Sequence, residues 1–266
     1  MAAEVCESTD ETAKTYQARD VRRINVLGVG VSALTLDSAW EAVLATLAAG
    51  RQGYVTVTGV HGVSECQGDP ELRAIHNRSL LSTPDGMPLV WMGRLQGVRR
   101  AEMDRVYGPD LMLKVLSHGQ QYGLRHFFYG GRPGVAETLR KRLQERFPDA
   151  QIVGTGTPPF RPLAEEEEHA LVDHWNQLRP HCIWVGLSTP KQERLMARLL
   201  GRYGMHRGSD GGPMQLEFPA VMFGVGAAFD FHSGEVRQAP PWMQRSGLEW
   251  SFRLQQDPPR LWRRYL

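Results

Sequence analysis

Residues 126–153 read HFFYGGRPGVAETLRKRLQERFPDAQIV, and this stretch decides the fold class. Its opening aromatic run predicts a buried strand, and the two glycines after it predict a turn. Residues 135–147 predict an amphipathic helix, because Leu139 and Leu143 lie four residues apart on one helical face. Residues 151–153 predict a second strand. A strand, a helix and a strand in this order are typical of a βαβ unit in a parallel sheet.

The same alternation of strands and helices runs through most of the chain. Apolar or β-branched runs predict further strands at residues 24–27, 54–58, 182–187 and 221–225. Amphipathic patterns predict helices at residues 39–47, 69–78, 89–95, 111–118, 165–178 and 191–200. We therefore predict an α/β fold, with a Rossmann-like, mostly parallel sheet and helices on both faces.

We expect three parts along the chain. Residues 1–22 are polar, lack the apolar core of a signal peptide, and are expected to be a disordered lead-in. Residues 23–236 carry the alternating pattern and form the expected Rossmann-like domain; within it, the glycine-rich polar segment 201–218 predicts a flexible loop or lid. Residues 237–266 are expected to form a helical, basic appendage.

Charge is unevenly placed along the chain. The net charge of the 266 residues is only +2, so the chain is not built as a nucleic-acid binder. Residues 237–266, however, hold six arginines against Glu249 and Asp257. Such an excess favours phosphates or an anionic membrane face, and a solvated helical face is the alternative. No run approaches the ~18 apolar residues of a membrane span.

Several common site motifs are missing from the sequence. The three cysteines, at positions 6, 66 and 182, form no C-x-x-C pair, which indicates a reducing compartment and no zinc framework. Glycine-rich turns follow predicted strands at Gly28, Gly130, Gly131 and Gly224, where the carboxyl edge of a parallel sheet receives nucleotide phosphates. None spells G-x-G-x-x-G, and Walker A and D-x-D patterns are absent. We therefore expect no cofactor and no metal.

Two segments carry polar residues that suit a nucleotide-sugar. Gln192 and Glu193 follow a Pro-Lys pair at a predicted helix start, where first-turn amides can meet a diphosphate and Gln192 a sugar or base edge. Simple helix capping is the alternative. Thr56, near a strand end, suits a phosphate or sugar oxygen, with β-propensity alone as the alternative.

Asp85 and Arg105 lie in predicted turns between apolar segments. Asp85, between a proline and a glycine, suits a general base that accepts a proton from a sugar hydroxyl. Its alternative role is to cap the helix that follows. Arg105 suits a phosphate, or else a surface salt bridge with Glu102 or Asp104.

Together these segments resemble the WecG/TagA/CpsF glycosyltransferase family (glycosyltransferase family 26). The resemblance covers about residues 24–266. It rests on LGV at 27–29, PDG at 84–86, RVYGPDL at 105–111, FYGG at 128–131, IVGT at 152–155, the segment 186–193, GVGAAFD at 224–230 and GLEW at 247–250.

This resemblance implies an inverting, metal-independent enzyme that transfers a sugar, commonly N-acetylmannosamine or its uronic acid, from a UDP-sugar. The implied acceptor is a sugar on a polyprenyl diphosphate at the inner face of the cytoplasmic membrane, where the protein would be peripheral. The product would be a cell-surface or exported polysaccharide. A homo-oligomer stays open, and no nucleic acid is expected as a partner.

The family pattern also assigns roles to individual residues. Asp85 falls on the proposed base, and Thr58 stands where the family usually has asparagine, which bears on sugar selection. Arg253, Arg260 and Arg263 fall on the arginines that contact the lipid diphosphate. The expected substrate-binding residues are Thr56, Thr58, Arg105, Gly130, Gly131, Gln192 and Glu193.

Two other classes of function stay open at this point. A non-catalytic, membrane-recruited scaffold for polysaccharide assembly would bind no UDP-sugar. An NAD-dependent oxidoreductase would need a glycine fingerprint and an acidic ribose ligand after the second strand, where this chain has Thr58.

Overall fold

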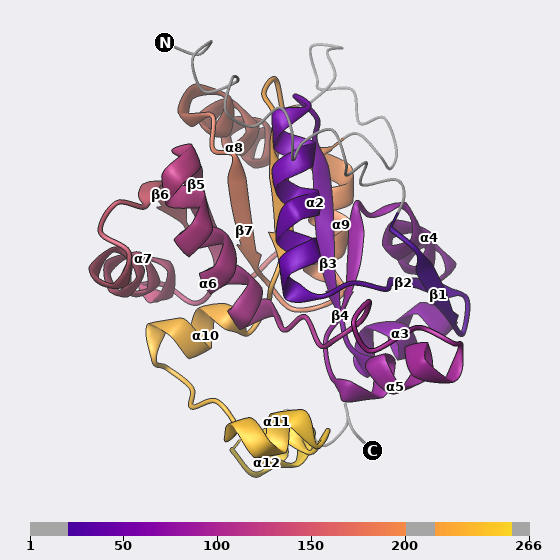
Figure 1. Cartoon of the computed structure of the whole chain (residues 1–266). Helices are drawn as coiled ribbons and strands as arrows, with labels where there is room; N and C mark the ends of the chain where they lie inside the picture. Colours follow the sequence, from indigo (N-terminus) through magenta and orange to yellow (C-terminus); the bar gives the residue numbers. More distant parts are fainter. Residues whose placement is uncertain (1–20, 201–215, 257–266) are drawn as a thin grey trace.

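The structure, a computed structural model, describes residues 21–200 and 216–256. Its centre is a sheet of six parallel strands in the order β4-β3-β8-β7-β5-β6 (Figure 1). The strands are β3 (Gly53–Thr58), β4 (Leu81–Pro84), β5 (Arg125–Gly130), β6 (Gln151–Gly156), β7 (Cys182–Gly186) and β8 (Val221–Gly224). This arrangement confirms the predicted α/β fold with a parallel sheet.

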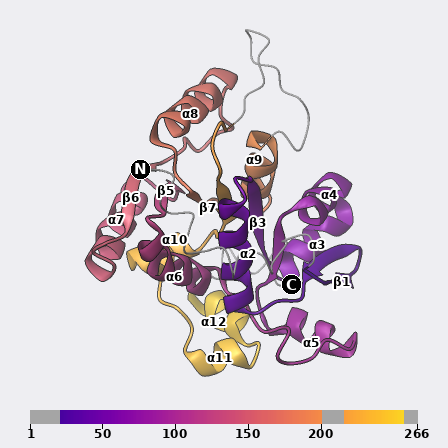
Figure 2. The same cartoon turned by 45° about the horizontal axis from the view of Figure 1, so that its top comes forward.

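Helices cover both faces of the sheet, as predicted (Figures 1 and 2). One face packs against α2 (Leu36–Ala48), α6 (Gly108–Gly119), α7 (Val135–Arg146) and α10 (Ala228–Ser233). The other face packs against α4 (Pro70–Arg78), α8 (Glu165–Leu178) and α9 (Lys191–Leu199). The βαβ unit predicted from residues 126–153 consists of β5, α7 and β6. A short 3-10 helix, η3 (Gln120–Tyr122), precedes β5.

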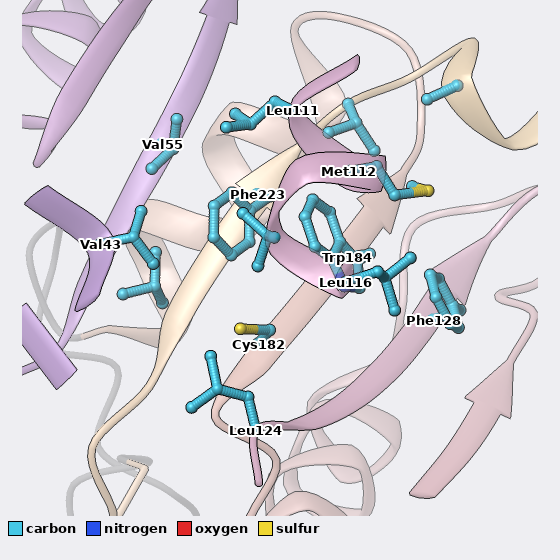
Figure 3. Packing of buried hydrophobic residues seen from close by; sticks show 14 of the residues in the cluster. Val43, Val55, Leu111, Met112, Leu116, Leu124, Phe128, Cys182, Trp184 and Phe223 are labelled. Atoms are coloured by element: carbon cyan, nitrogen blue, oxygen red, sulfur yellow. The ribbon is translucent and has the colours of Figure 1, made fainter. Parts of the chain in front are cut away.

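Stacked aromatic rings occupy the middle of the core beneath α6 (Figure 3). Phe128 of β5, Trp184 of β7 and Phe223 of β8 lie side by side in register on one face of the sheet. The ring centroids of Trp184 and Phe223 are 4.2 Å apart and stacked. Each such pair adds about 0.5–1.5 kcal/mol beyond the area that it buries. The Trp184 indole also donates a hydrogen bond to His126 Nδ1 at 3.2 Å.

The first predicted strand does not join this sheet. Instead β1 (Arg23–Val26) and β2 (Val29–Ser32) form a separate antiparallel hairpin. Its two-residue turn, Leu27 and Gly28, has positive φ at both positions (51° and 84°), as a type I′ turn requires. The expectation that Gly28 lies at the carboxyl edge of the parallel sheet was therefore wrong, and the glycine serves a hairpin turn.

The hairpin covers the edge strand β4 and is fixed there by a half-buried arginine, Arg23. Ser32 Oγ accepts a hydrogen bond from the backbone N–H of Ser82 in β4. The Arg23 guanidinium donates to the carbonyl oxygens of His76, Ser79 and Leu80 at the end of α4. A cation at the carboxyl end of a helix is favoured by the helix dipole. A covered edge cannot pair with another chain.

Three elements near this edge differ from the sequence prediction. Pro84 is the last residue of β4, so the turn contains only Asp85 and Gly86. An additional helix, α3 (Val60–Gly68), precedes α4, and α5 (Met87–Leu95) starts two residues earlier than predicted. The chain ends, within the described residues, with α11 (Pro241–Arg245) and α12 (Glu249–Gln256), which Figure 1 places beyond the carboxyl ends of the strands.

The carboxyl ends of β5 and β7 approach each other so closely that side chains do not fit between them. A Cβ on Gly130 would lie 2.6 Å from the backbone of Gly186, and a Cβ on Gly186 would lie 2.5 Å from the Phe229 ring. The N–H of Gly131 donates to the Gly186 carbonyl at 3.0 Å. Glycine at these positions is thus required by packing as well as by positive φ at Gly130 and Gly131.

Replacing Gly186 by alanine is expected to destabilise the protein by about 1–3 kcal/mol, because the new methyl group overlaps the Phe229 ring. Gly68→Ala is the matched control. It adds a methyl group to the end of α3 where no atom lies within 4 Å, and it should be neutral or stabilising by up to about 1 kcal/mol. Urea unfolding measures both; equal midpoints for the two variants would contradict the packing described here.

The fold should also lose stability in mild acid because of His76. Burial, and then the charge of Arg23, lower the pKa of this histidine from 6.5 to about 4. As the pH falls below 6.5, His76 takes up a proton in the unfolded chain but not yet in the folded protein. The contribution of His76 to the free energy of unfolding is therefore fully present above pH 6.5 and decreases toward pH 4. His76→Gln should remove up to about 3 kcal/mol of this fall. Denaturant unfolding of the wild type and of His76→Gln between pH 6.5 and pH 4 measures the difference. Equal losses of stability in the two proteins would contradict a role of His76.

Candidate active site

The site expected from the sequence lies at the carboxyl ends of β3, β4 and β8. The connection after β3 leads to α3 and α4, whereas the connection after β8 leads to α10 on the opposite face of the sheet. Neighbouring strands whose connections diverge in this way mark the usual ligand position in open α/β sheets. The beginning of α6 also packs here, because a Cβ on Gly108 would contact Val57 and the Val225 backbone.

Asp85 is held at this edge by the backbone. Its N–H donates to the carbonyl of Thr58 at 2.8 Å, one residue beyond the end of β4. A Cβ on Gly59 would lie 3.2 Å from the Asp85 carbonyl and 3.9 Å from its carboxylate Oδ2. Since Gly59 is the N-cap of α3, the half-buried carboxylate lies beside a helix N-terminus, which favours a negative charge.

The capping alternative for Asp85 does not match the observed helix start. Gly86, with φ 108°, is the N-cap residue of α5 and has no side-chain cap. Asp85 precedes it, so its carboxylate is not in the N-cap position. The role as a base remains a prediction that this geometry accommodates.

Thr56 and Thr58 face inward, into a buried polar cluster below Asp85. Thr58 Oγ1 lies 3.1 Å from His76 Nδ1, 2.8 Å from Ser82 Oγ and 3.2 Å from Thr56 Oγ1. All four side chains are buried. Both threonines therefore support the strand end that carries the site, and their contact with a substrate remains a prediction. His76 was not predicted, because a lone histidine in a helix gives no signal of its strand partner.

Gln192 and Glu193 are buried at the start of α9 and hold the turn after β8. Gln192 Oε1 accepts a hydrogen bond from the Gly226 N–H at 3.1 Å. Glu193 Oε1 accepts from Gln192 Nε2 and from Thr189 Oγ1, both at 3.0 Å. This network joins the carboxyl ends of β7 and β8. Gly130 and Gly131 lie at the end of neighbouring β5, where close packing and positive φ account for glycine without a ligand.

Arg105 joins the main domain to the last two helices. Its guanidinium donates to Glu249 Oε2 of α12 at 3.2 Å and to Gln244 Oε1 of α11 at 2.6 Å. Asp110 Oδ2 lies 3.6 Å away. The side chains of Arg105 and Glu249 are only 11% and 17% exposed. Pairs with so little solvent are screened less than surface pairs.

The alternative salt bridges of Arg105 with its sequence neighbours are not those observed. Glu102 accepts from the guanidinium of Arg99 at 2.7 Å. Asp104 Oδ1 accepts from the backbone N–H of Arg105, not from its guanidinium. Arg105 is therefore directed toward the appendage.

Tyr107 stacks against Arg105 and contacts the same glutamate, Glu249. The Arg105 guanidinium stacks 4.3 Å from the centre of the Tyr107 ring. The Tyr107 hydroxyl donates to Glu249 Oε1 at 3.0 Å. Burial, and then the charges of Glu249 and Asp85, raise the pKa of Tyr107 well above its usual range. The hydroxyl thus stays protonated and within electrostatic reach of Asp85.

One of the three predicted diphosphate-binding arginines is described. The Arg253 guanidinium lies 5.5 Å from the centre of the Phe231 ring and 4.0 Å from Glu249 Oε1. Arg260 and Arg263 lie outside the described residues. The structure therefore brings Arg253 together with Arg105, Tyr107 and Glu249.

Two residues of this cluster were not predicted from the sequence, although both lie in motifs that carry the family resemblance. Glu249 belongs to the GLEW motif and Tyr107 to the RVYGPDL motif, although neither was predicted as a site residue. Among the residues that the structure describes, no three His, Cys, Asp or Glu side chains gather where they could hold a metal ion. No helix within residues 21–200 and 216–256 is long and apolar enough to span a membrane.

Comparison with known proteins identifies the family to which the chain belongs. The family model described as "Glycosyl transferase WecG/TagA/CpsF family" matches residues 24–266. A curated relative from Bacillus spizizenii is 29% identical over 203 residues, which are 76% of this chain and 70% of the relative. That protein is named N-acetylglucosaminyldiphosphoundecaprenol N-acetyl-beta-D-mannosaminyltransferase. The resemblance inferred from the motifs is thus confirmed: this chain belongs to the WecG/TagA/CpsF family and is a glycosyltransferase.

Proposed function

We propose that this enzyme transfers an N-acetylmannosamine-type sugar from a UDP-sugar to a sugar carried on a polyprenyl diphosphate. The observation that carries the proposal is the position of Asp85. Its carboxylate lies at the carboxyl edge of the sheet, beside the N-terminus of α3, and within electrostatic reach of Tyr107. The family match and the name of the Bacillus relative support the choice of sugar and acceptor.

The proposed reaction is a single displacement at the anomeric carbon. Asp85 takes the proton of the acceptor hydroxyl, whose oxygen forms the new glycosidic bond as the bond between that carbon and the UDP oxygen breaks. UDP leaves with the bonding electron pair, and the anomeric configuration inverts. Arg105 and helix N-termini stabilise the charge that develops on the leaving diphosphate. This assignment needs no metal ligand, in keeping with the missing D-x-D pattern.

The donor is proposed to bind along the ends of β3, β5, β7 and β8. Gln192 and Glu193 position the turn at Gly226 through the hydrogen bonds described above. The proposed contacts to the UDP-sugar come from Thr56, Thr58, Arg105, Gly130, Gly131, Gln192 and Glu193. Because both threonines are buried, their contribution requires that the donor reach the strand end through a local rearrangement.

The acceptor is proposed to bind between Asp85 and α12. Arg253 would contact the lipid diphosphate together with Arg260 and Arg263. An acceptor anchored in a bilayer places the enzyme at the inner face of the cytoplasmic membrane, and the excess of arginine in residues 237–266 suits an anionic surface.

Asp85→Asn tests the proposed base. It keeps the size of the side chain but cannot accept the proton, so turnover should fall about 10²- to 10⁴-fold. The assay measures UDP release with a polyprenyl-diphosphate-linked N-acetylglucosamine acceptor in detergent. Unchanged unfolding and UDP binding serve as controls. Near-wild-type turnover in the folded variant would remove Asp85 as the base.

Glu249→Gln tests the contact between the main domain and α12. The variant loses the charge that Arg105 and Tyr107 contact, so KM for the acceptor should rise about tenfold or more. Limited proteolysis should also cut residues 237–248 faster. Glu235→Gln is the matched control, because Glu235 forms an exposed pair with Arg132 at 3.1 Å. Equal kinetics and cleavage for the two variants would contradict a role of the Arg105–Glu249 contact in acceptor binding.

A further inference from the structure

The hairpin, α3 and α5 lie near one another at one edge of the molecule (Figure 1). An apolar groove of about 360 Å³ lies between them, beside the candidate site. This volume is within the range of about 300–1,000 Å³ that is typical of ligand pockets. Residues of all three elements line it, chief among them Val26, Leu27, Val60, Val63, Leu89 and Met92.

Leu27 is an unusual residue for its position. It is 69% exposed and has a φ of 51° in a turn that favours asparagine, aspartate or glycine. A leucine there gains little from burial and has an unfavourable backbone conformation. Val60, the first residue of α3, is 55% exposed and also lines the groove. Exposed apolar side chains that line a concave surface mark a binding site for an apolar group.

The turn that carries Leu27 is held in place by side chains from three directions. Gln67 of α3 donates to the Leu27 carbonyl at 3.1 Å. Asn77 donates to the Gly28 carbonyl at 3.0 Å, and Asn25 Oδ1 accepts from the Gly28 N–H at 2.7 Å. The wall of the groove is therefore formed before any ligand arrives, which lowers the entropic cost of binding.

The groove begins directly beside Asp85. Val60 follows Gly59, whose Cβ position lies 3.9 Å from the Asp85 carboxylate. Pro88, also on the groove lining, follows Asp85 by three residues, at most about 11 Å of extended chain. An acceptor whose sugar hydroxyl meets Asp85 therefore has this groove within reach of the first part of its lipid.

We propose that the groove binds the isoprene units next to the diphosphate of the acceptor lipid. This inference rests on the proposed function, and it adds a specificity site for the lipid. The enzyme would then distinguish acceptors by their hydrocarbon as well as by their sugar. A bilayer surface or a second copy of this chain is an alternative occupant, and the experiments below separate these.

Photocrosslinking tests the location directly and does not require turnover. A polyprenyl diphosphate with a photoreactive group on an isoprene unit near the diphosphate is irradiated with the full-length protein in detergent. Peptides from α3, α5 or residues 25–30 should be labelled, and excess unlabelled polyprenyl diphosphate should prevent labelling. Labelling elsewhere, or no displaceable labelling, would overturn the proposal. Specific labelling without sugar transfer from any UDP-sugar would keep the groove assignment and overturn the proposed function.

Kinetics with two acceptors test the effect on specificity. One acceptor carries a polyprenyl chain and the other a short, water-soluble alkyl chain on the same sugar diphosphate. Leu27→Asn gives the turn its preferred Asn-Gly sequence, so it should fold well while removing an apolar wall. The ratio of kcat/KM for the long acceptor to that for the short one should fall roughly tenfold.

Phe160→Ser is the control, since Phe160 is 85% exposed and follows β6 at the opposite edge of the sheet. It should leave the ratio unchanged. An unchanged ratio in Leu27→Asn would overturn the proposal. Weaker vesicle binding of Leu27→Asn with an equal loss of kcat/KM for both acceptors would also overturn it and would indicate a bilayer surface. A changed molecular mass in solution would overturn it too and would indicate an interface between copies of the chain.

Discussion

The hydrogen bond from the Asp85 N–H to the Thr58 carbonyl extends the pairing of β3 and β4 by one residue beyond the last pair of the strands. Much of the candidate site depends on this extension. It fixes the peptide of Asp85 against the start of α3 and leaves the side chain at the carboxyl edge. The buried cluster of Thr58, Ser82 and His76 below it limits how far the strand end can move. A base must be held precisely to be effective, and here the backbone supplies that constraint.

The second constraint is the contact between Arg105 and the last two helices. Arg105 donates hydrogen bonds to side chains of both α11 and α12, and the Tyr107 hydroxyl donates a further hydrogen bond to Glu249. The same segment is tied to β4, because the Val106 N–H donates to the Pro84 carbonyl at 2.9 Å. The loop therefore connects the strand that ends at Asp85 to the helices that carry Arg253. The acceptor site we propose would form only when α12 is in this position.

The parts of the fold that could be predicted from the sequence are those with local patterns. Residues 126–153 contain a strand, a turn and a helix with a regular apolar pattern, so β5, α7 and β6 were recognisable. The hairpin of β1 and β2 was not recognisable, because its turn is Leu-Gly instead of Asn-Gly. Strand β4 was missed as well, because it has only four residues and the last is a proline. The motifs located Asp85 and Arg105, but not their surroundings. Glu249 lies 144 residues from its partner Arg105, and nothing in the local sequence of Thr58 shows that its hydroxyl faces His76.

Hydrogen–deuterium exchange with and without UDP–N-acetylmannosamine would test the central claim most directly, that the carboxyl ends of β3, β5, β7 and β8 and the Arg105 segment form one donor site. We predict slower exchange on binding in residues 56–60, 104–110, 129–132, 186–193 and 224–228, with little change in residues 146–151 at the other end of the sheet. Slower exchange confined to other segments, or none in a protein shown to bind the donor, would contradict this account.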